Sequence, residues 1–231
     1  MAYSGEDLFK NYRKTYVISP FRASQVSPLG YDLRIGHAVS LHYTSPDAKG
    51  SVQAQMEVPS EFHAAHVTHL PAQPLLKELT IAPGQSFLVV TVEQICLGSK
   101  VLATVQAKAS LSIQGLFLNP VTVDPNFASD EGASGRLVLF LHNASGRKVK
   151  IKEKDGIATL IMHEVSTETT HLPEKSGFSM LLDALEKNYD GSVIQSFSGY
   201  TKEYDNTRAL SEFMRDRKAL LNVRTPHRPH N

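Results

Sequence analysis

The feature that most limits how this chain can fold is its stretch from Tyr16 to Val165. There, short runs rich in Val, Ile, Leu and Thr alternate with turn residues such as Pro83-Gly84 and Asp155-Gly156. Many short strands with regular turn signals are typical of a β-sandwich or β-barrel, whereas βαβ units would place helical stretches between the strands. We therefore predict a mainly β fold. The clearest expected strands are 86–92, 101–107, 116–123, 136–142, 148–152 and 157–163.

The two ends of the chain show helical spacing instead. Residues 6–14 place Leu8, Phe9 and Tyr12 on one face, and helices are also expected at 178–188 and 202–223. The Gly-, Ser- and Tyr-rich stretch 189–204 is expected to be a loop. These patterns divide the chain into an N-terminal helical segment (1–15), a β domain (16–165), a C-terminal helical extension (166–223) and a disordered tail (224–231).

Composition limits the partners and the compartment. The 231 residues carry a formal net charge of +1, so no overall field attracts nucleic acid or acidic membranes. The single cysteine, Cys96, excludes an intrachain disulfide and is expected in the core, which is consistent with a reducing cytoplasm. Met1–Lys14 lacks the apolar region of a signal peptide, and no stretch approaches the roughly 20 apolar residues of a membrane span. We expect a cytoplasmic protein with no membrane partner and no direct nucleic-acid partner.

Four stretches follow one another in a recognisable order: 30–36 (GYDLRIG), 81–116, 122–127 (TVDPNF) and 135–160. The ordered set resembles dCTP deaminase throughout, and its first and third stretches also resemble the trimeric dUTPases. The resemblance implies a distorted β-barrel or jelly roll of the dUTPase type, with C-terminal helices. It also implies a homotrimer with active sites between subunits, a pyrimidine deoxynucleoside triphosphate as ligand, and Mg²⁺ bound through the phosphates.

The same resemblance assigns roles to individual residues. Asp124 matches the aspartate that activates water for attack on the α-phosphate, a step suited to an ionised carboxylate. The alternative for Asp124 is a turn-starting residue before Pro125. Lys108 and Ser110 match the phosphate grip, and Asp32 matches a residue that holds water or Mg²⁺, although it could equally bond its own backbone. The other expected nucleotide contacts are Gln114, Asn119, Thr122 and Val123.

Departures from the family pattern concern both phosphate binding and deamination. Lys108-Ala109-Ser110 replaces Arg-Ser-Ser, and a second family arginine is replaced at Ile113 or Gln114. Lys keeps the charge of Arg but lacks its bidentate fork. Phe140 lies where the deaminases carry their general acid–base glutamate, and Phe cannot transfer protons. Asp130 or Glu131, in a longer loop, could supply a carboxylate, or this loop is simply a solvated acidic one.

Other candidate sites have weaker patterns. His63, His66 and His69 are spaced by three, but Pro59 and Pro71 bracket them and no partner cysteine follows, so a zinc site is not expected. The basic run 147–154 is either a solvated strand face or a phosphate contact.

Three hypotheses remain at this point. The first is phosphoanhydride hydrolysis of a pyrimidine deoxynucleoside triphosphate through Asp124, which is favoured over deamination. The second is a catalytically silent nucleotide-binding or regulatory trimer. The third is a protein-interaction module.

Overall fold

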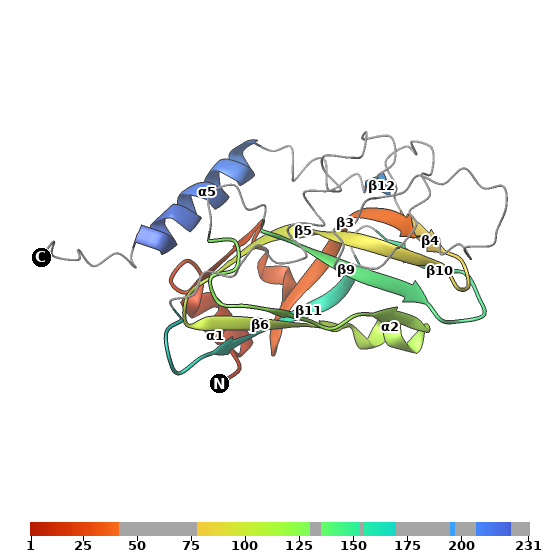
Figure 1. The fold of residues 1–231 in the computed structure, drawn as a ribbon, viewed down its shortest axis with the longest axis horizontal. Helices are drawn as coiled ribbons and strands as arrows, with labels where there is room; N and C mark the ends of the chain where they lie inside the picture. The colour runs from red at the N-terminus through yellow and green to blue at the C-terminus, as the bar shows by residue number, and fades with distance from the viewer. Residues whose placement is uncertain (42–77, 130–134, 153–154, 170–194, 197–206, 223–231) are drawn as a thin grey trace, which may run out of the picture.

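The computed structural model describes residues 1–41, 78–129, 135–152, 155–169, 195–196 and 207–222. These residues form a curled, mostly antiparallel half-barrel (Figure 1), which confirms the prediction of a mainly β fold. The strands are β1 Tyr16–Ser19, β2 Val26–Ser27, β3 Gly30–Leu41, β4 Glu78–Ile81, β5 Ser86–Leu97, β6 Val101–Ala107, β7 Leu116–Leu118, β8 Val121–Val123, β9 Arg136–Asn143, β10 Val149–Lys152, β11 Gly156–Glu164 and β12 Gln195–Ser196. The helical elements are α1 Gly5–Asn11, the 3-10 turn η1 Ala23–Gln25, α2 Ala109–Ile113 and α5 Thr207–Asn222.

The main sheet runs in the order β7-β9-β5-β3-β11-β6-β8, with β1 added to β5 and β2 and β12 added to β3. Strands β10 and β4 pair separately as a ribbon. Alternate residues of a strand face opposite sides of the sheet, and in β6 the buried set is Val101, Ala103 and Val105. These side chains belong to one continuous core, so the intervening residues of β6 lie on the outer face.

The expected strand 116–123 is two strands. β7 ends at Leu118 and β8 begins at Val121, because Pro120 has no N–H to donate to a ladder. Asn119 replaces the missing pairing: its Oδ1 accepts the N–H of Phe140 at 2.6 Å, and its own N–H donates to the Phe140 carbonyl at 3.1 Å. The chain therefore changes neighbours here, from β9 to β6.

Strand β5 extends five residues beyond the expected end at residue 92 and includes Cys96. That residue is fully buried, as expected, and packs with Val17 and Leu220 of α5.

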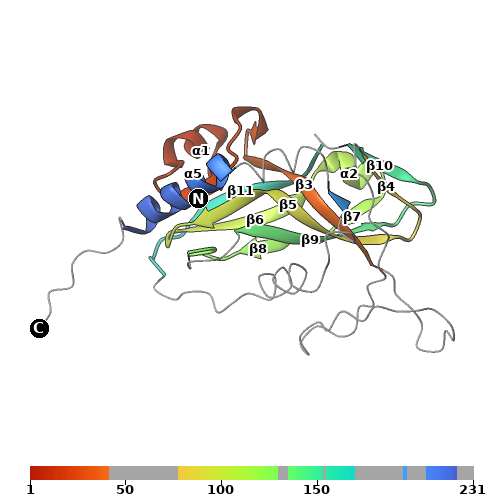
Figure 2. The same cartoon turned by 90° about the horizontal axis from the view of Figure 1, so that it is seen from above.

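Arg13 and Asp216 form an ion pair at 2.8 Å, and α1 and α5 lie at the same end of the sheet (Figure 2). Met214 of α5, in contrast, is exposed.

Helix α1 is shorter than the expected 6–14. It begins with a capping box between Ser4 and Asp7 and ends at Asn11, and Arg13 adopts a left-handed φ of 63°. Several predicted features lie outside the described residues. They are the helix 178–188, most of the loop 189–204, the tail 224–231, the histidines at 63, 66 and 69, and the acidic residues Asp130 and Glu131. Within the described part of the chain, no helix has the length and hydropathy to cross a membrane.

Two buried tyrosines hold the segment between β1 and β3. The Tyr31 hydroxyl donates to the Pro20 carbonyl at 3.1 Å and accepts the Arg22 N–H at 2.8 Å. The Tyr16 hydroxyl donates to the Leu8 carbonyl. The ring of Phe21 lies 5.3 Å from that of Tyr31, centroid to centroid. The position of the backbone at Arg22 is therefore set by these contacts with buried tyrosines, and not by the sequence of the loop itself.

Burial raises the pKa of Tyr16 and of Tyr31 well above the ordinary value of 10. Because the pKa is higher in the folded than in the unfolded state, the contribution of each tyrosine to the free energy of unfolding is fully present below pH 10. This contribution is lost as the pH rises further, by about 1.4 kcal/mol per pH unit for each tyrosine. We expect the free energy of unfolding, measured by urea titration, to fall steeply above about pH 10. Tyr16→Phe should remove one tyrosine's share of that slope; an unchanged slope would contradict this.

Candidate functional site

The candidate site is centred on Asp32 of β3. Thr159 of β11 pairs with Asp32 in the sheet register, and its hydroxyl donates to Asp32 Oδ1 at 3.0 Å. The Lys108 ammonium, which comes from the residue directly after β6, forms an ion pair with Asp32 Oδ2. Both partners are partly buried, with side-chain exposures of 32% for Lys108 and 20% for Asp32. Two residues that the sequence assigned to phosphate and metal binding are therefore in direct contact.

Gly156 makes the close approach of these chains possible. A Cβ at this position would lie 3.2 Å from Lys108 Cδ and 3.4 Å from Asp32 Cβ. A side chain here would require the Lys108 side chain to shift by a few tenths of an ångström, because a contact of 3.2 Å is tight. The glycine at the start of β11 leaves room for the Lys108–Asp32 pair as it stands.

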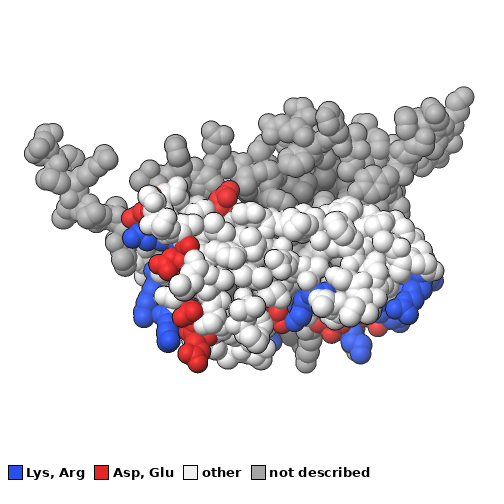
Figure 3. All heavy atoms as spheres, turned by 90° about the horizontal axis from the view of Figure 1, so that it is seen from below, with Lys and Arg blue, Asp and Glu red and all other residues white. Residues whose placement is uncertain are grey.

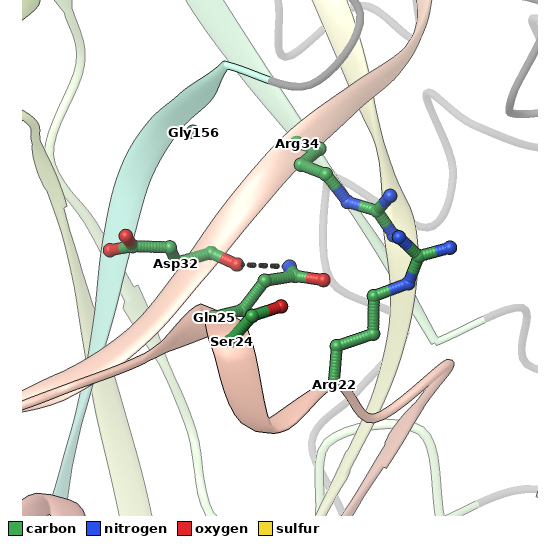
Figure 4. A pocket seen from close by; sticks show the side chains of 6 residues that line it. All are labelled: Arg22, Ser24, Gln25, Asp32, Arg34 and Gly156. Atoms are coloured by element: carbon green, nitrogen blue, oxygen red, sulfur yellow. Dashed lines mark hydrogen bonds between the residues drawn. The ribbon is translucent and has the colours of Figure 1, made fainter.

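A pocket opens beside this pair, with a cavity volume of about 210 Å³. It is lined by Arg22, Ser24, Gln25, Asp32, Arg34 and Gly156. Figure 4 shows the guanidinium ends of Arg22 and Arg34 pointing toward one another from η1's N-cap position and from β3. The sequence alone did not identify Arg22, Ser24 and Gln25 as site residues, because nothing in their local pattern marks them. Arg34 could have been identified, since it lies two residues after Asp32 in the same strand and its side chain is therefore on the same face.

The floor of the pocket is a buried polar network around Glu93 of β5, which is fully buried. Glu93 Oε1 accepts from Arg34 Nε and from Gln25 Nε2, each at 2.8 Å, and its Oε2 accepts the Arg34 N–H at 2.9 Å. Gln25 Nε2 donates also to the Asp32 carbonyl at 2.6 Å. This network holds Arg34 and Gln25 in fixed positions next to Asp32.

The remaining expected nucleotide contacts are spread over the α2–β8 segment. Ser110 lies exposed on α2, and its carbonyl accepts from Gln114 Nε2 at 2.8 Å. Thr122 is exposed on the outer face of β8, whereas the side chain of Val123 is buried in the core, so Val123 offers a ligand its main chain only. Asn119 is engaged with the Phe140 backbone, as described above.

Asp124 lies far from Lys108 within one chain. The register pairs Val123 with Ala103, which places Asp124 beside Leu102, six residues from Lys108 along β6. At roughly 3.3 Å per residue this is a separation of about 20 Å. Asp124 is exposed and begins a turn closed by Phe127 N–H to the Asp124 carbonyl at 3.2 Å, so its side chain is not needed to close the turn. One chain alone does not bring the expected phosphate grip and the expected base together.

Phe140 is half-buried on β9, and its ring stacks on that of His142, with centroids 6.3 Å apart and 8° between planes. His142 Nδ1 is hydrogen-bonded to Ser86 Oγ at 2.9 Å. At the position where the family resemblance led us to expect a proton-transferring carboxylate, the chain therefore carries a phenyl ring.

The residues around Asp32 suit a cation-binding role only through water. Its two carboxylate oxygens already accept from Thr159 and Lys108, and no cluster of three His, Cys, Asp or Glu side chains occurs in the described ranges. Mg²⁺ can be held by one carboxylate and several waters when substrate phosphates supply further oxygens. Asp32 fits that arrangement as an acceptor for a metal-bound water.

Comparison with known proteins agrees with these features. A family model described as dCTP deaminase-like matches residues 3–165. The dCTP deaminase of Thermococcus kodakarensis is 30% identical over 140 residues, covering 61% of this chain and 70% of the relative. That of Pyrococcus horikoshii is 25% identical over 188 residues, covering 80% and 92%. A 2'-deoxycytidine 5'-triphosphate deaminase structure from Agrobacterium tumefaciens shares the fold with a TM-score of 0.50 at 12% identity; the match covers 71% of this chain and about half (49%) of that one.

The half-barrel and these matches define a protein of the dCTP deaminase type, as the motif order predicted. The family model matches more than half of the chain, so the chain belongs to the dCTP deaminase-like family.

Proposed function

We propose that this protein binds a pyrimidine deoxynucleoside triphosphate as a homotrimer and hydrolyses a phosphoanhydride bond with Asp124 as general base. The observation that carries the proposal is the pair of contacts that Asp32 makes with Lys108 and with Thr159 at the edge of a pocket lined by two arginines. A partly buried ammonium beside guanidinium groups favours a polyanion, since each charge-assisted hydrogen bond is stronger than a neutral one.

The chemistry assigned to each residue follows from its position. Lys108 would donate to phosphate oxygens after the ligand displaces it from Asp32, and the exposed Ser110 on α2 would add a neutral donor. Asp124 would accept the proton of the attacking water as oxygen bonds to phosphorus and pyrophosphate leaves. Mg²⁺, when bound through the phosphates, would neutralise charge on them.

Hydrolysis is favoured over deamination because of Phe140. Deamination moves protons between water, the ring nitrogen and the leaving amine, and Phe140 with its stacked His142 offers no carboxylate for that transfer. The Ala109 and Phe140 replacements equally support the alternative of a catalytically silent nucleotide-binding trimer, which shares the same ligand but not the turnover.

Lys108→Ala should weaken binding of dCTP or dUTP by about 1.5–3 kcal/mol, the usual contribution of a charge-assisted hydrogen bond. Calorimetric titration of the full chain measures this directly. The matched control is Lys100→Ala, an exposed lysine at the turn between β5 and β6, which should leave the affinity unchanged. No detectable binding of any pyrimidine nucleotide by the unmodified protein would overturn the proposal; equal weakening by both substitutions would reject the role of Lys108.

We expect light scattering to give about three times the mass of one chain. The distance of about 20 Å between Asp124 and Lys108 supports this, because a second copy must supply one of them if both act on one ligand. Figure 3 shows a broad face of the protein, which is the side on which β6 and α2 lie in Figure 1. The charged side chains of this face lie at its edges, and a centre poor in charged residues is common at subunit interfaces. A stable monomer at micromolar concentration would contradict the shared site.

A further inference from the structure

We propose that His142 of β9 is a specificity-determining residue that contacts the base of the nucleotide, and that its Nε2–H selects a 4-oxopyrimidine such as uracil over cytosine. The inference rests on the proposed function and narrows its substrate class. It is carried by the hydrogen bond of His142 to a buried serine, by the rings that share its face of the sheet, and by the position of that face next to α2.

The hydrogen bond between Ser86 and His142 fixes the tautomer of the imidazole. Ser86 is 2% exposed, and its Oγ lies 2.9 Å from His142 Nδ1. The described residues offer this hydroxyl no second partner, and a buried O–H without an acceptor is costly. The serine therefore donates to Nδ1, and the hydrogen of the neutral ring lies on Nε2.

Nε2 of His142 is thus a donor whose direction is fixed. A flip of the ring would put a carbon in the place of Nδ1 and break the bond to Ser86. Nε2 has no hydrogen-bond partner among the described residues and is not one of their enclosed polar atoms, and the side chain is only half-buried. This donor is therefore open to a ligand.

Three rings share this face of the sheet. Phe117 of β7 pairs with His142 in the register, and Phe140 lies two residues before His142 on β9. Directly opposed residues, and residues two apart in a strand, place their side chains on one face. Phe117 is 53% exposed, and the ring planes of Phe140 and His142 differ by only 8°. Accessible aromatic rings favour the stacking of a planar base.

This face lies next to the part of the chain that the proposed function assigns to phosphate. Helix α2, which carries Ser110, leads directly into β7, and the Gly115 carbonyl between them accepts the Ala144 N–H at 2.9 Å. β9 ends at the same end of the sheet as α2 (Figure 1). A nucleotide whose phosphates contact Ser110 can therefore place its base against Phe117 and His142.

A fixed donor distinguishes the two pyrimidines at position 4 of the ring. Uracil and thymine present a carbonyl oxygen there, which accepts a hydrogen bond, whereas cytosine presents an amino group, which donates one. Two donors that face each other are both left without an acceptor, so a site with a fixed donor rejects the analogue that cannot accept from it. The Nε2–H of His142 therefore favours the 4-oxo base.

Calorimetry with the α,β-imido analogues of dUTP and dCTP, which differ only in the base, tests this assignment on the full chain. The unmodified protein should bind the dUTP analogue about 10- to 100-fold more tightly than the dCTP analogue. His142→Phe keeps a ring but removes the donor, so it should abolish most of this preference and change the affinity for the dCTP analogue less than about twofold. The matched control is His163→Phe, which replaces a half-buried histidine of β11 bonded to Thr104 and should leave the ratio of the two affinities unchanged.

The tautomer is measured separately, by proton–nitrogen correlation spectra of the histidine rings. The signals of His142 are those lost in His142→Phe, and in the neutral ring they should place the hydrogen on Nε2. A melting curve checks that each variant folds, and the preference of the unmodified protein and its tautomer test the inference without any variant of the binding surface.

The outcomes separate the inference from the proposed function. Equal affinity of the unmodified protein for the two analogues, or tighter binding of the dCTP analogue, would overturn the role of His142 and leave the proposed function standing. An equal loss for both analogues in His142→Phe, or a hydrogen on Nδ1 in the neutral ring, would also overturn that role. Failure of the unmodified protein to bind either analogue would overturn the proposed function itself, and the inference with it.

Discussion

Glu93→Ala should lower the free energy of unfolding by about 3–5 kcal/mol, the range found when one partner of a buried ion pair is removed. Glu93 is fully buried and accepts three hydrogen bonds, from Arg34 Nε, the Arg34 N–H and Gln25 Nε2. Its removal leaves a guanidinium that is 9% exposed without its carboxylate and opens a void between β3 and β5. Urea titration at neutral pH measures the loss.

The control for Glu93 is Glu78→Ala. Glu78 pairs with Lys150 at 2.5 Å, but the two side chains are 40% and 61% exposed, so this loss should stay below about 1 kcal/mol. A further variant, Glu93→Leu with Arg34→Met, removes both charges together and should recover part of the stability. If Glu93→Ala were as mild as Glu78→Ala, the buried network would not hold the pocket as described.

Asp124→Asn should reduce kcat by about 10²–10⁴-fold, the usual contribution of a positioned general base, with little change in ground-state binding. Asn is nearly isosteric with Asp and can still form hydrogen bonds, but it cannot accept a proton from water. The turn at Asp124 is closed by its carbonyl, so the substitution leaves the backbone bond to Phe127 in place. Initial rates over a range of nucleotide concentrations separate kcat from KM.

A mixing experiment extends the Asp124 prediction to the shared site. Lys108→Ala and Asp124→Asn chains, refolded together, should regain part of the activity that each lacks alone, because some sites would then combine an intact Lys108 with an intact Asp124 from another chain. Equal turnover in the unmodified protein and Asp124→Asn would instead show that the base lies elsewhere.

The sequence predicted the strands well where a buried face repeats with period two, as in β6, because that pattern follows directly from core packing. It missed the break at Asn119-Pro120, since apolar residues continue on both sides of it. The contact of Lys108 with Asp32 was not predicted, although both residues were singled out, because a motif assigns roles and not distances. The pocket depends on pairs such as Gln25 with Glu93, 68 residues apart, which only the folded chain brings together.

The central claim, phosphoanhydride hydrolysis of a pyrimidine deoxynucleoside triphosphate, is tested most directly by product analysis. The full chain is incubated with Mg²⁺ and each deoxynucleoside and ribonucleoside triphosphate in turn, and the products are resolved by chromatography. We predict a nucleoside monophosphate and pyrophosphate from a pyrimidine deoxynucleotide, with the base unchanged. Release of ammonia from dCTP with its triphosphate intact, or recovery of every nucleotide unchanged, would contradict the account.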